Sequence, residues 1–212
     1  MMQVIGSYTS PFVRKVRVAL IEHKLPFDFR EETPYTADTP VRDFNPLVKV
    51  PAFVDANGET WFDSALILAV LETQKPEGSG SLLPQDPMAQ LQVRRLETLA
   101  DGIGDAGVLM FMEKKRDESE QSLGWITRQQ EKVDNGLAFF ERYLNERLDK
   151  DFLHDFDGGL GLSTADIALV CVLEWYTLRF NADWRKQYPR LAEYARQIGE
   201  RESFVTTKPP GA

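Results

Sequence analysis

Three short segments near the start of the chain combine hydroxyl, carboxylate and backbone groups of the kind that hold a small charged ligand. They are residues 8–15 (YTSPFVRK), residues 45–53 (NPLVKVPAF) and residues 62–64 (FDS). Each segment falls where a predicted strand or loop leads into the next element. A hydroxyl, a strand edge and a carboxylate–hydroxyl pair are therefore presented together, and this set suits a small, charged, peptide-like thiol.

Ser10 stands directly before a predicted helix, with Pro11 at the first helical position, where proline is favoured. A hydroxyl at this place can cap the helix. It also lies close to free backbone N–H groups and to the positive end of the helix dipole. By itself this pattern predicts an N-cap. In the third segment, either Asp63 or Ser64 is expected to cap the helix that follows.

The elements that position these groups alternate between strand and helix patterns over the first third of the chain. Apolar residues at helical spacing follow Pro11, and Asn57-Gly58 is typical of a hairpin turn. The predicted order is β-α-β-α-β-β-α, with strands at 3–8, 26–30, 51–55 and 60–62, a helix after Pro11, a short irregular helix within 36–46 and a helix at 64–72.

The rest of the chain reads as helical. Residues 76–87 (PEGSGSLLPQDP) concentrate proline, glycine and serine and are interpreted as a linker. The sequence 163–166 (STAD) resembles a capping box, flanked by Leu162 and Ile167 as a hydrophobic staple. The expected domains are 1–75, with a linker at 76–87, and an all-helical domain at 88–212. One buried helical stripe is expected from Val133, Leu137, Phe140, Leu144 and Leu148.

Composition excludes several classes of protein. The chain has 25 Lys plus Arg against 33 Asp plus Glu, a net charge of -8, which argues against a nucleic-acid binder. No stretch approaches the roughly 20 apolar residues of a membrane span, and the start of the chain has no signal-peptide pattern. A single cysteine rules out an internal disulfide and fits a reducing compartment. The cytoplasm is the expected location.

The motifs together resemble those of the cytosolic glutathione transferases, and the resemblance runs essentially from end to end. It is carried by the Ser-Pro-Phe helix start, the NPLVKVPAF loop, the Asp63-Ser64 pair and the capped helix at Ser163. The chain looks most like bacterial YibF-type members, which share GSYTSPFVRK, LADGI-DAG and a RESF-T-PP tail. The resemblance implies a thioredoxin-like N-terminal domain followed by an all-helical domain, no metal, and an isologous homodimer.

The resemblance implies that the hydroxyl of Ser10 donates a hydrogen bond to the sulfur of glutathione and is the catalytic group. Tyr8 and Thr9 are alternatives, because related classes place the hydroxyl one or two residues earlier. A free thiol with a pKa of about 8.5 is only a few per cent thiolate at pH 7. Lowering that pKa by about two units requires roughly 2.7 kcal/mol of preferential thiolate stabilisation.

The resemblance also assigns the remaining glutathione contacts. Pro51 is expected to follow a cis peptide bond, with Val50 pairing with the cysteinyl backbone of glutathione in the manner of an added strand. Lys49 is expected near a glutathione carboxylate, although a solvated lysine fits equally well. Asp63 is expected to pair with the γ-glutamyl ammonium group, and Ser64 with the γ-glutamyl carboxylate.

One residue departs from the family pattern. The loop usually reads NP-x-G-K-V-P, and Val48 replaces its glycine. A positive φ would strain a valine, so we expect an ordinary φ here.

The wall of the second-substrate site is expected in the run 109–112 (LMFM), with Met110 and Phe111, together with Tyr8; core packing explains such a run equally well. Asp101 and Asp105 could face a subunit partner, the cleft or solvent.

The remaining candidate residues are expected to have structural or surface roles rather than functional ones. Cys171 shares an apolar stripe and is expected to be buried and inert; no cysteine occupies the Ser10 position, which disfavours glutaredoxin-like exchange. The two histidines show no metal-binding spacing. The remaining expectations are a solvated helix face for Arg14, Lys15 and Arg17, and surface or structural roles for His23 and His154.

The leading hypothesis is a glutathione transferase that activates glutathione as a thiolate and adds it to a small electrophile, with no covalent enzyme intermediate. Two alternatives use the same motifs. One is a glutathione-binding stress or interaction protein without turnover, and the other is a glutathione-dependent disulfide reductase, isomerase or peroxidase. The sequence does not identify the electrophile.

Overall fold

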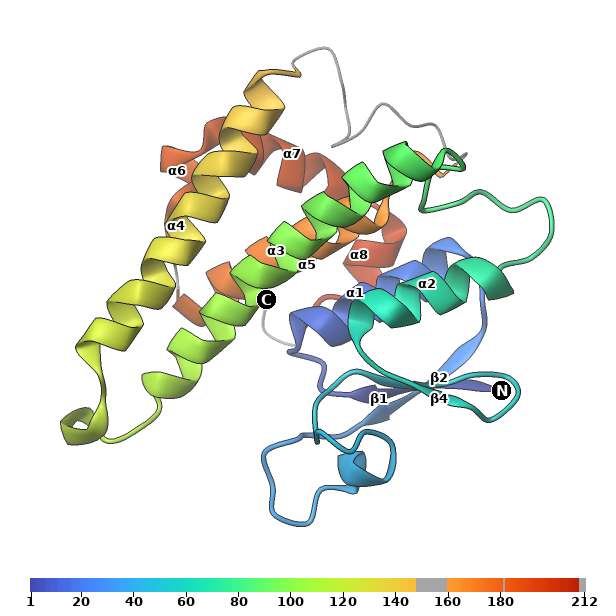
Figure 1. Cartoon of the computed structure of the whole chain (residues 1–212), viewed down its shortest axis with the longest axis horizontal. Coiled ribbons are helices and arrows are strands. Elements are labelled where there is room, and N and C mark those ends of the chain that lie inside the picture. Colours follow the sequence, from blue (N-terminus) through green and yellow to red (C-terminus); the bar gives the residue numbers. More distant parts are fainter. Residues whose placement is uncertain (148–159, 181, 210–212) are drawn as a thin grey trace.

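The computed structural model describes residues 1–147, 160–180 and 182–209, which form a small sheet region followed by a helical region (Figure 1). The predicted order β-α-β-α-β-β-α is confirmed, with a single 3₁₀ turn, η1, in place of the second helix. The sheet region contains β1 (Met2–Gly6), α1 (Pro11–Glu22), β2 (Phe27–Glu31), η1 (Pro40–Asp43), β3 (Ala52–Val54), β4 (Thr60–Trp61) and α2 (Ser64–Gln74). The helical region contains α3 (Pro87–Glu113), the 3₁₀ turn η2 (Glu118–Glu120), α4 (Leu123–Asn145), α5 (Thr164–Phe180), α6 (Trp184–Gln187), α7 (Pro189–Gly199) and α8 (Glu202–Thr206).

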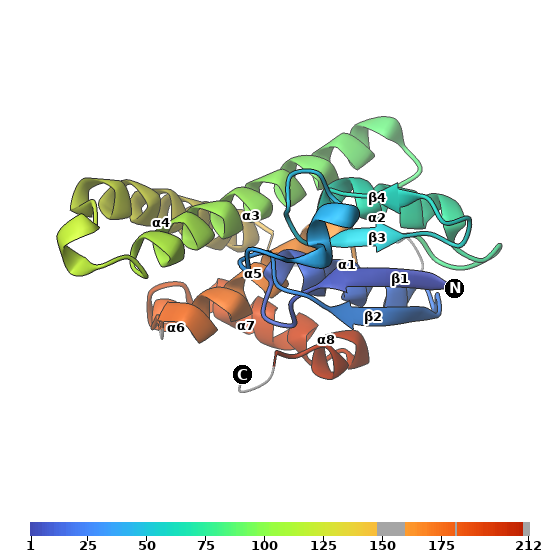
Figure 2. The same ribbon diagram turned by 90° about the horizontal axis from the view of Figure 1, so that it is seen from below.

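The sheet has the strand order β2-β1-β3-β4. Strand β1 runs parallel to β2 and antiparallel to β3, which pairs antiparallel with β4. Val4 lies at the centre of β1, in register with Phe29 on one side and Phe53 on the other. Helices α1 and α2 lie side by side on one face of the sheet, and η1 lies beyond the other face (Figures 1 and 2). Residues 7–10 connect the carboxyl end of β1 to α1, which packs against α5 of the helical region.

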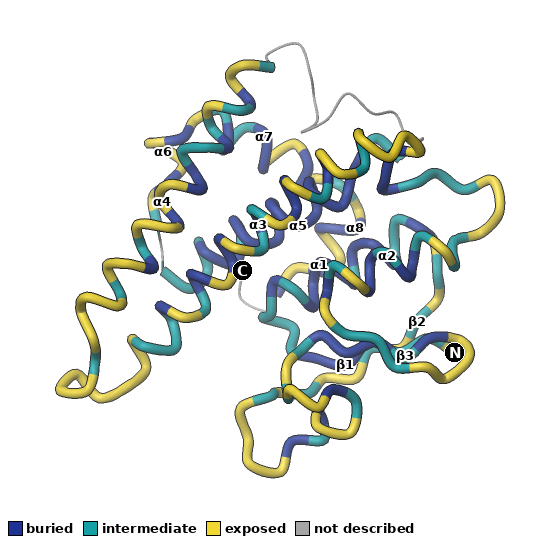
Figure 3. Tube along the Cα trace, viewed as in Figure 1, coloured by how far each residue is buried: buried dark blue, intermediate teal, exposed yellow. Residues whose placement is uncertain are grey.

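Helix α5 forms the centre of the helical region. Twelve of its seventeen residues are buried, and it packs against α3, α1 and α7. A helix that is apolar around its whole circumference has to be surrounded in this way. The burial colouring shows α5 as an almost continuous dark segment behind α3 (Figure 3). Cys171 is 1% exposed within α5, and burial raises the pKa of its thiol to about 12, so the prediction of a buried thiol is confirmed.

The start of α5 has the predicted capping box. The backbone N–H of Ser163 donates to Asp166 Oδ2 at 2.6 Å, and the N–H of Asp166 donates to Ser163 Oγ at 3.4 Å. Leu162 and Ile167, the proposed staple, are both buried in the same core. Each of two free backbone N–H groups is thus satisfied by a side chain, as the motif requires.

The stripe on α4 is also confirmed over the described residues. Val133, Leu137, Phe140 and Leu144 are all at most 1% exposed. Leu148, the last member of the predicted stripe, and His154 lie outside the described residues. No helix among the described ranges is both long and apolar enough to cross a membrane.

Glu72 ties the segment that follows α2 back onto the sheet region. Its Oε1 accepts from the backbone N–H of Leu82 at 2.7 Å and lies 2.9 Å from His23 Nε2, and its Oε2 accepts from Ser81 Oγ at 2.7 Å. Burial raises the pKa of Glu72, but hydrogen bonds, that of His23 foremost, outweigh it and leave the pKa at about 2. His23 is fully buried at 1% exposure and has a structural role, which is one of the two roles expected for it.

Gly136 is a point of close approach between α4 and α3. A Cβ at this position would lie 2.5 Å from two carbons of the Ile103 side chain. Ile103 is 3% exposed and has little room to move. Gly136→Ala is therefore expected to lower the free energy of unfolding by about 1–3 kcal/mol, as overpacking does.

Gly124→Ala on the same helix is the matched control, because nothing lies within 4 Å of its added Cβ. Its free energy of unfolding should stay within about 0.5 kcal/mol of wild type. Urea denaturation of the three proteins measures the difference. Equal effects of the two substitutions would show that α3 and α4 are not packed at this distance.

Candidate functional site

Ser10 is the N-cap of α1, as predicted. The backbone N–H of Val13 donates to Ser10 Oγ at 3.3 Å. The side chain is half-buried, and among the described residues its hydroxyl has no acceptor of its own. The hydroxyl proton is therefore available for a ligand placed at the positive end of the helix dipole.

The two alternative hydroxyls lie differently. Thr9 Oγ1 is 3.1 Å from Ser7 Oγ, so these two hydroxyls bond to each other. The ring of Tyr8 lies 4.5 Å from that of Phe29 on β2, between centroids, and the guanidinium of Arg17 lies 5.0 Å from its centroid. Tyr8 is thus packed toward the β2 edge of the sheet, while Ser10 stays at the helix end.

Gly6, at the end of β1, brings the first two segments together. A Cβ built on Gly6 would lie 2.4 Å from Val13 Cγ2 and 3.2 Å from Val50 Cβ. The first turn of α1 and the loop before β3 therefore meet over a position that has no side chain. Sequence reasoning missed this role, and the only signal is a glycine at the last position of a strand.

The loop before β3 is held by Asn45, which is 3% exposed. Its Oδ1 accepts from the N–H of Leu47 at 2.9 Å, and its Nδ2 donates to the carbonyl of Lys49, also at 2.9 Å. The peptide bond between Val50 and Pro51 is cis, as the resemblance implied. Asn45 was not among the predicted site residues, although asparagine before proline is a recognisable turn signal.

The expectation for Val48 was wrong. Its φ is 52°, a left-handed conformation that a β-branched residue adopts only at a cost of about 1–2 kcal/mol. The conformation is held because the N–H of Val48 donates to the carbonyl of Asn45 at 2.8 Å, and because its side chain packs on the small cluster of Ile5, Val41 and Ala52. The loop keeps the turn for which the family uses glycine.

Asp63 caps α2, because its Oδ1 accepts from the N–H of Ala65 at 2.8 Å. The side chain remains exposed. Ser64 is 3% exposed, and its hydroxyl lies 3.5 Å from Lys15 Nζ. The hydroxyl of Ser64 therefore faces the protein interior, and its backbone N–H belongs to the first turn of α2.

Charges of both signs gather around the start of α2. Lys49 and Asp105 are both exposed. The pKa of Asp105 is raised overall: partial burial raises it, the charge of Lys49 lowers it, and the charge of Asp63 raises it, so both charges lie within electrostatic range of Asp105. One cation and two anions at a helix N-terminus form a surface that suits a zwitterion.

The expectation that Lys15 lies on a solvated face of α1 was wrong. It is 1% exposed, and its Nζ lies 2.8 Å from Glu97 Oε1 and 2.7 Å from Asp101 Oδ2. Burial lowers the pKa of Lys15, but the two carboxylates outweigh it and raise the value overall. Burial, only partly offset by Lys15, raises the pKa of Asp101 to about 6. Asp101 is thus part of a buried ion cluster that joins α1 to α3.

Arg14 is buried in the same way and joins α1 to the C-terminal helices. It is 1% exposed, forms an ion pair with Glu174 on α5, and donates to the carbonyl of Phe204 at 2.9 Å and to Thr207 Oγ1 at 3.2 Å. Arg17 is half-buried, and its guanidinium also lies 4.8 Å from the ring centroid of Phe29. The expectation for α1 was wrong because these partners come from helices far away in the sequence.

Met110 and Phe111, which were both expected to line a second-substrate site, lie in different environments. Met110 is fully buried in the core, so its side chain does not reach a surface. Phe111 is half-buried and makes edge-to-face contacts with Trp175 and Phe180, with 6.3 Å between centroids in each case. Of the run 109–112, Phe111 is therefore the residue that combines an accessible ring with an aromatic cluster.

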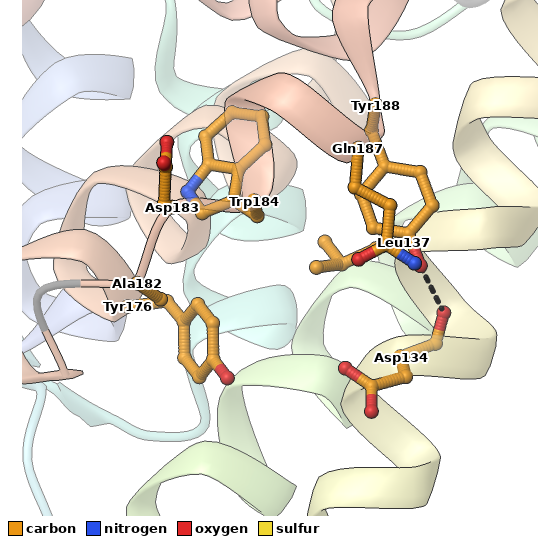
Figure 4. Close-up of a pocket in the computed structure, with 8 residues that line it drawn as sticks. All are labelled: Asp134, Leu137, Tyr176, Ala182, Asp183, Trp184, Gln187 and Tyr188. Atoms are coloured by element: carbon orange, nitrogen blue, oxygen red, sulfur yellow. Dashed lines mark hydrogen bonds between the residues drawn. The ribbon is translucent and has the colours of Figure 1, made fainter.

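A pocket of about 250 Å³ lies elsewhere, between α4, the end of α5 and α6 (Figure 4). Asp134 and Asp183 give it a negative character, and Tyr188 donates to the carbonyl of Asp134 at 3.4 Å. No residue of the predicted glutathione site lines it. A pocket with two carboxylates is poorly suited to glutathione, which carries a net negative charge. Among the described residues no group of acidic, histidine and cysteine side chains could hold a metal ion.

The fold is that of the glutathione transferases, and comparisons with known proteins agree. Residues 9–74 match the family model for the N-terminal domain of glutathione S-transferases, and residues 124–197 match that for the C-terminal domain. The GST-like protein YibF of Escherichia coli, itself described as uncharacterised, is 40% identical over the full length of both chains. The chain belongs to the glutathione S-transferase family.

Solved structures support the same assignment. A glutathione S-transferase of Methylobacterium radiotolerans in complex with glutathione sulfonate is 38% identical, with a TM-score of 0.89 over 100% of this chain and 96% of that one. One from Methylobacillus flagellatus with glutathione bound is 36% identical, also with a TM-score of 0.89, over 99% of this chain and 100% of that one. A family member from Pseudomonas fluorescens with bound S-(propanoic acid)-glutathione is 30% identical, with a TM-score of 0.81 over 99% and 100%.

Proposed function

We propose that the protein binds glutathione at the N-terminal ends of α1 and α2 and transfers it, as the thiolate, to a small electrophile. The observation that carries the proposal is the hydroxyl of Ser10, which caps α1 and has a proton free to donate. Relatives with glutathione, glutathione sulfonate or S-(propanoic acid)-glutathione bound support it. The last ligand is a glutathione whose sulfur carries a carboxylic acid substituent.

In this proposal the cysteinyl part of glutathione pairs with the backbone of Val50, beside Pro51. Lys49 offsets the charge of one glutathione carboxylate. The free N–H groups of α2, beginning with that of Ser64, receive the γ-glutamyl carboxylate, since a helix N-terminus favours an anion. Asp63 is exposed beside them and pairs with the γ-glutamyl ammonium group.

The proposed chemistry requires only stabilisation of a thiolate and proximity. Ser10 donates its hydroxyl proton in a hydrogen bond to the sulfur anion, and charge-assisted bonds of this kind are about twice as strong as neutral ones. The dipole of α1 contributes about 0.3–1 kcal/mol more. The thiol proton leaves to solvent, the sulfur attacks the electrophilic carbon, and the leaving group departs with its bonding electrons.

Asp63→Asn tests the proposed ammonium contact. Asparagine retains an oxygen that can cap α2 but loses the negative charge, so the dissociation constant of glutathione should rise about tenfold or more. Isothermal titration calorimetry with reduced glutathione at pH 7 measures it.

Asp86→Asn is the matched control, because Asp86 caps α3 through the same kind of bond, from the N–H of Ala89 at 2.8 Å. Its affinity for glutathione should not change. An Asp63 variant that binds as tightly as wild type would show that the γ-glutamyl group lies elsewhere.

The homodimer, the cytoplasmic location and the domain boundaries at 75 and 87 stay predictions.

A further inference from the structure

We propose that the second-substrate site contains an anion-binding group formed by Lys115 and Arg179 around the ring of Phe111, so that the preferred electrophiles carry a carboxylate. This inference rests on the proposed transferase function, which it deepens by assigning a substrate class. It starts from the ring of Phe111. The ammonium nitrogen of Lys115 lies 4.7 Å from the ring centroid, and the guanidinium carbon of Arg179 lies 4.9 Å from it.

A third cation lies beside these two. Lys114 Nζ is 5.4 Å from the centroid of Phe180, whose ring contacts that of Phe111 edge to face. Three positive charges thus gather around two adjacent aromatic rings at the ends of α3 and α5. The chain as a whole has a net charge of -8, so this local group of positive charges is opposite in sign to the overall charge of the protein.

None of the three cations forms an ion pair with a described residue. The Nε of Arg179 is buried and has no hydrogen-bond partner in the described part of the chain. Nearby carboxylates are already engaged. Glu113 accepts from the backbone N–H of Ser122 at 2.8 Å, and Glu174 forms its ion pair with Arg14. A buried N–H donor without a partner is costly, and an anionic group of a ligand would remove that cost.

The position of this group relative to Ser10 fits a second substrate. The ring of Phe12, two residues after Ser10, packs against Gly104 of α3, where an added Cβ would be 3.1 Å away. Phe111 follows Gly104 by two helical turns, about 10 Å along α3. An electrophile that reacts at the sulfur beside Ser10 can therefore reach Arg179 when its anionic substituent and the hydrogen bond that it accepts together span about 10 Å.

A benzyl halide with a para-carboxylate matches this geometry. With 4-(chloromethyl)benzoate, the thiolate sulfur attacks the benzylic carbon, a carbon–sulfur bond forms, and chloride leaves with the electrons of the carbon–chlorine bond. The product is S-(4-carboxybenzyl)glutathione. Its carboxylate would accept from the Nε of Arg179 and interact with Lys115, whereas S-benzylglutathione offers no such group.

The test is the binding of these two conjugates, measured by isothermal titration calorimetry. Arg179→Gln should weaken S-(4-carboxybenzyl)glutathione about tenfold or more, because it removes a charged hydrogen bond. S-benzylglutathione should change by less than about twofold. Lys115→Gln should weaken the carboxylated conjugate about threefold, and Arg179→Lys, which keeps the charge, should retain part of the lost affinity.

Arg142→Gln is the matched control, since Arg142 also lies over an aromatic ring, 6.0 Å from the centroid of Phe139, but on α4. It should leave both affinities unchanged. The proposal is overturned if wild type binds the two conjugates equally, or if Arg179→Gln weakens both by the same factor.

Failure of the transferase function would look different. Suppose that S-(4-carboxybenzyl)glutathione binds more tightly than S-benzylglutathione, but that the protein turns over neither 4-(chloromethyl)benzoate nor its uncharged methyl ester. The anion-binding group would then be supported and the transferase activity would be refuted. If both electrophiles are turned over with equal kcat/KM and the conjugates bind equally, the transferase stands and the anion-binding group is refuted.

Discussion

Replacing Ser10 with alanine is expected to lower kcat/KM for the electrophile, at saturating glutathione, about fiftyfold at pH 6.5. A bound thiol with a pKa near 6.5 is about half ionised at that pH, whereas one with the free value of about 8.5 is about 1% ionised. Glutathione affinity should fall only modestly, because the remaining proposed contacts are unchanged. The rate loss should shrink as the pH rises toward 8.5, where the free thiol ionises unaided. Steady-state kinetics with a benzyl halide between pH 6 and 9 measures it.

Two control variants separate the sulfur contact from the helix cap. Ser10→Thr keeps a hydroxyl at the same position and should retain most of the activity. Thr9→Ala removes the neighbouring hydroxyl, which bonds to Ser7, and should change the rate little. If Thr9→Ala lost the rate and Ser10→Ala kept it, the sulfur contact would belong to Thr9. Loss of the cap itself costs about 1 kcal/mol of stability, which urea denaturation detects separately.

Replacing Lys15 with methionine should be the most destabilising single change proposed for this protein. The side chain is 1% exposed and lies between Glu97 and Asp101. Its removal leaves two carboxylates facing each other in a buried site, and breaking a buried ion pair in this way costs about 3–5 kcal/mol. Urea denaturation at pH 7 should show a loss of that size. Lys132→Met, at an exposed position on α4, should stay within about 0.5 kcal/mol of wild type.

The pH dependence of the Lys15 variant identifies the cause. Burial and repulsion from Glu97 raise the folded-state pKa of Asp101, and removing the lysine takes away the interaction that lowers it, so this pKa rises further above its unfolded value. A raised pKa means that the folded protein binds more protons, so its stability falls as the pH rises from the unfolded value toward the folded one. The gap between wild type and Lys15→Met should therefore narrow as the pH is lowered from 7 to 5. A gap that is constant over this range would attribute the loss to packing alone.

The sequence predicted those parts of the structure that depend on local patterns. The order of elements followed from hydrophobic periodicity and from turn residues, and the caps at Ser10, Asp63 and Ser163 followed from residue types directly before helical runs. Each of these features is decided within about four residues along the chain. The family resemblance then supplied the cis bond at Pro51, which no local pattern distinguishes from an ordinary one.

Features that depend on distant partners were missed. Arg14 and Lys15 lie on α1 at positions that look polar, but Glu174 and Glu97 are brought to them by helices that begin far along the chain. A buried ion pair cannot be recognised when only one member is considered, because burial is a property of the fold. Val48 was misjudged for a related reason: Asn45 holds its unfavourable φ through a hydrogen bond, and a general preference says nothing about such compensation.

The same distinction applies to the candidate site: features set by the local sequence were predicted, and features set by distant contacts were not. The sequence predicted which residues belong to the ends of α1 and α2, but it did not predict that Gly6 lets the first turn of α1 meet the loop before β3. It proposed Met110 and Phe111 equally, and only the structure separates the buried side chain from the accessible one. Nothing in the sequence singled out Arg179, since a lone arginine near a helix end is common. Only the folded structure shows that its Nε is buried without a hydrogen-bond partner among the described residues.

The most direct test of the central claim is an ultraviolet difference titration of the glutathione thiolate on the wild-type protein, with Ser10→Ala in parallel. The absorbance of the thiolate is followed from pH 5 to pH 10 with saturating protein. We predict a bound-thiol pKa about two units below the free value of about 8.5, returning most of the way toward that value in Ser10→Ala. Saturable binding with an unshifted pKa in the wild-type protein would contradict the thiolate mechanism and leave a protein that binds glutathione without activating it.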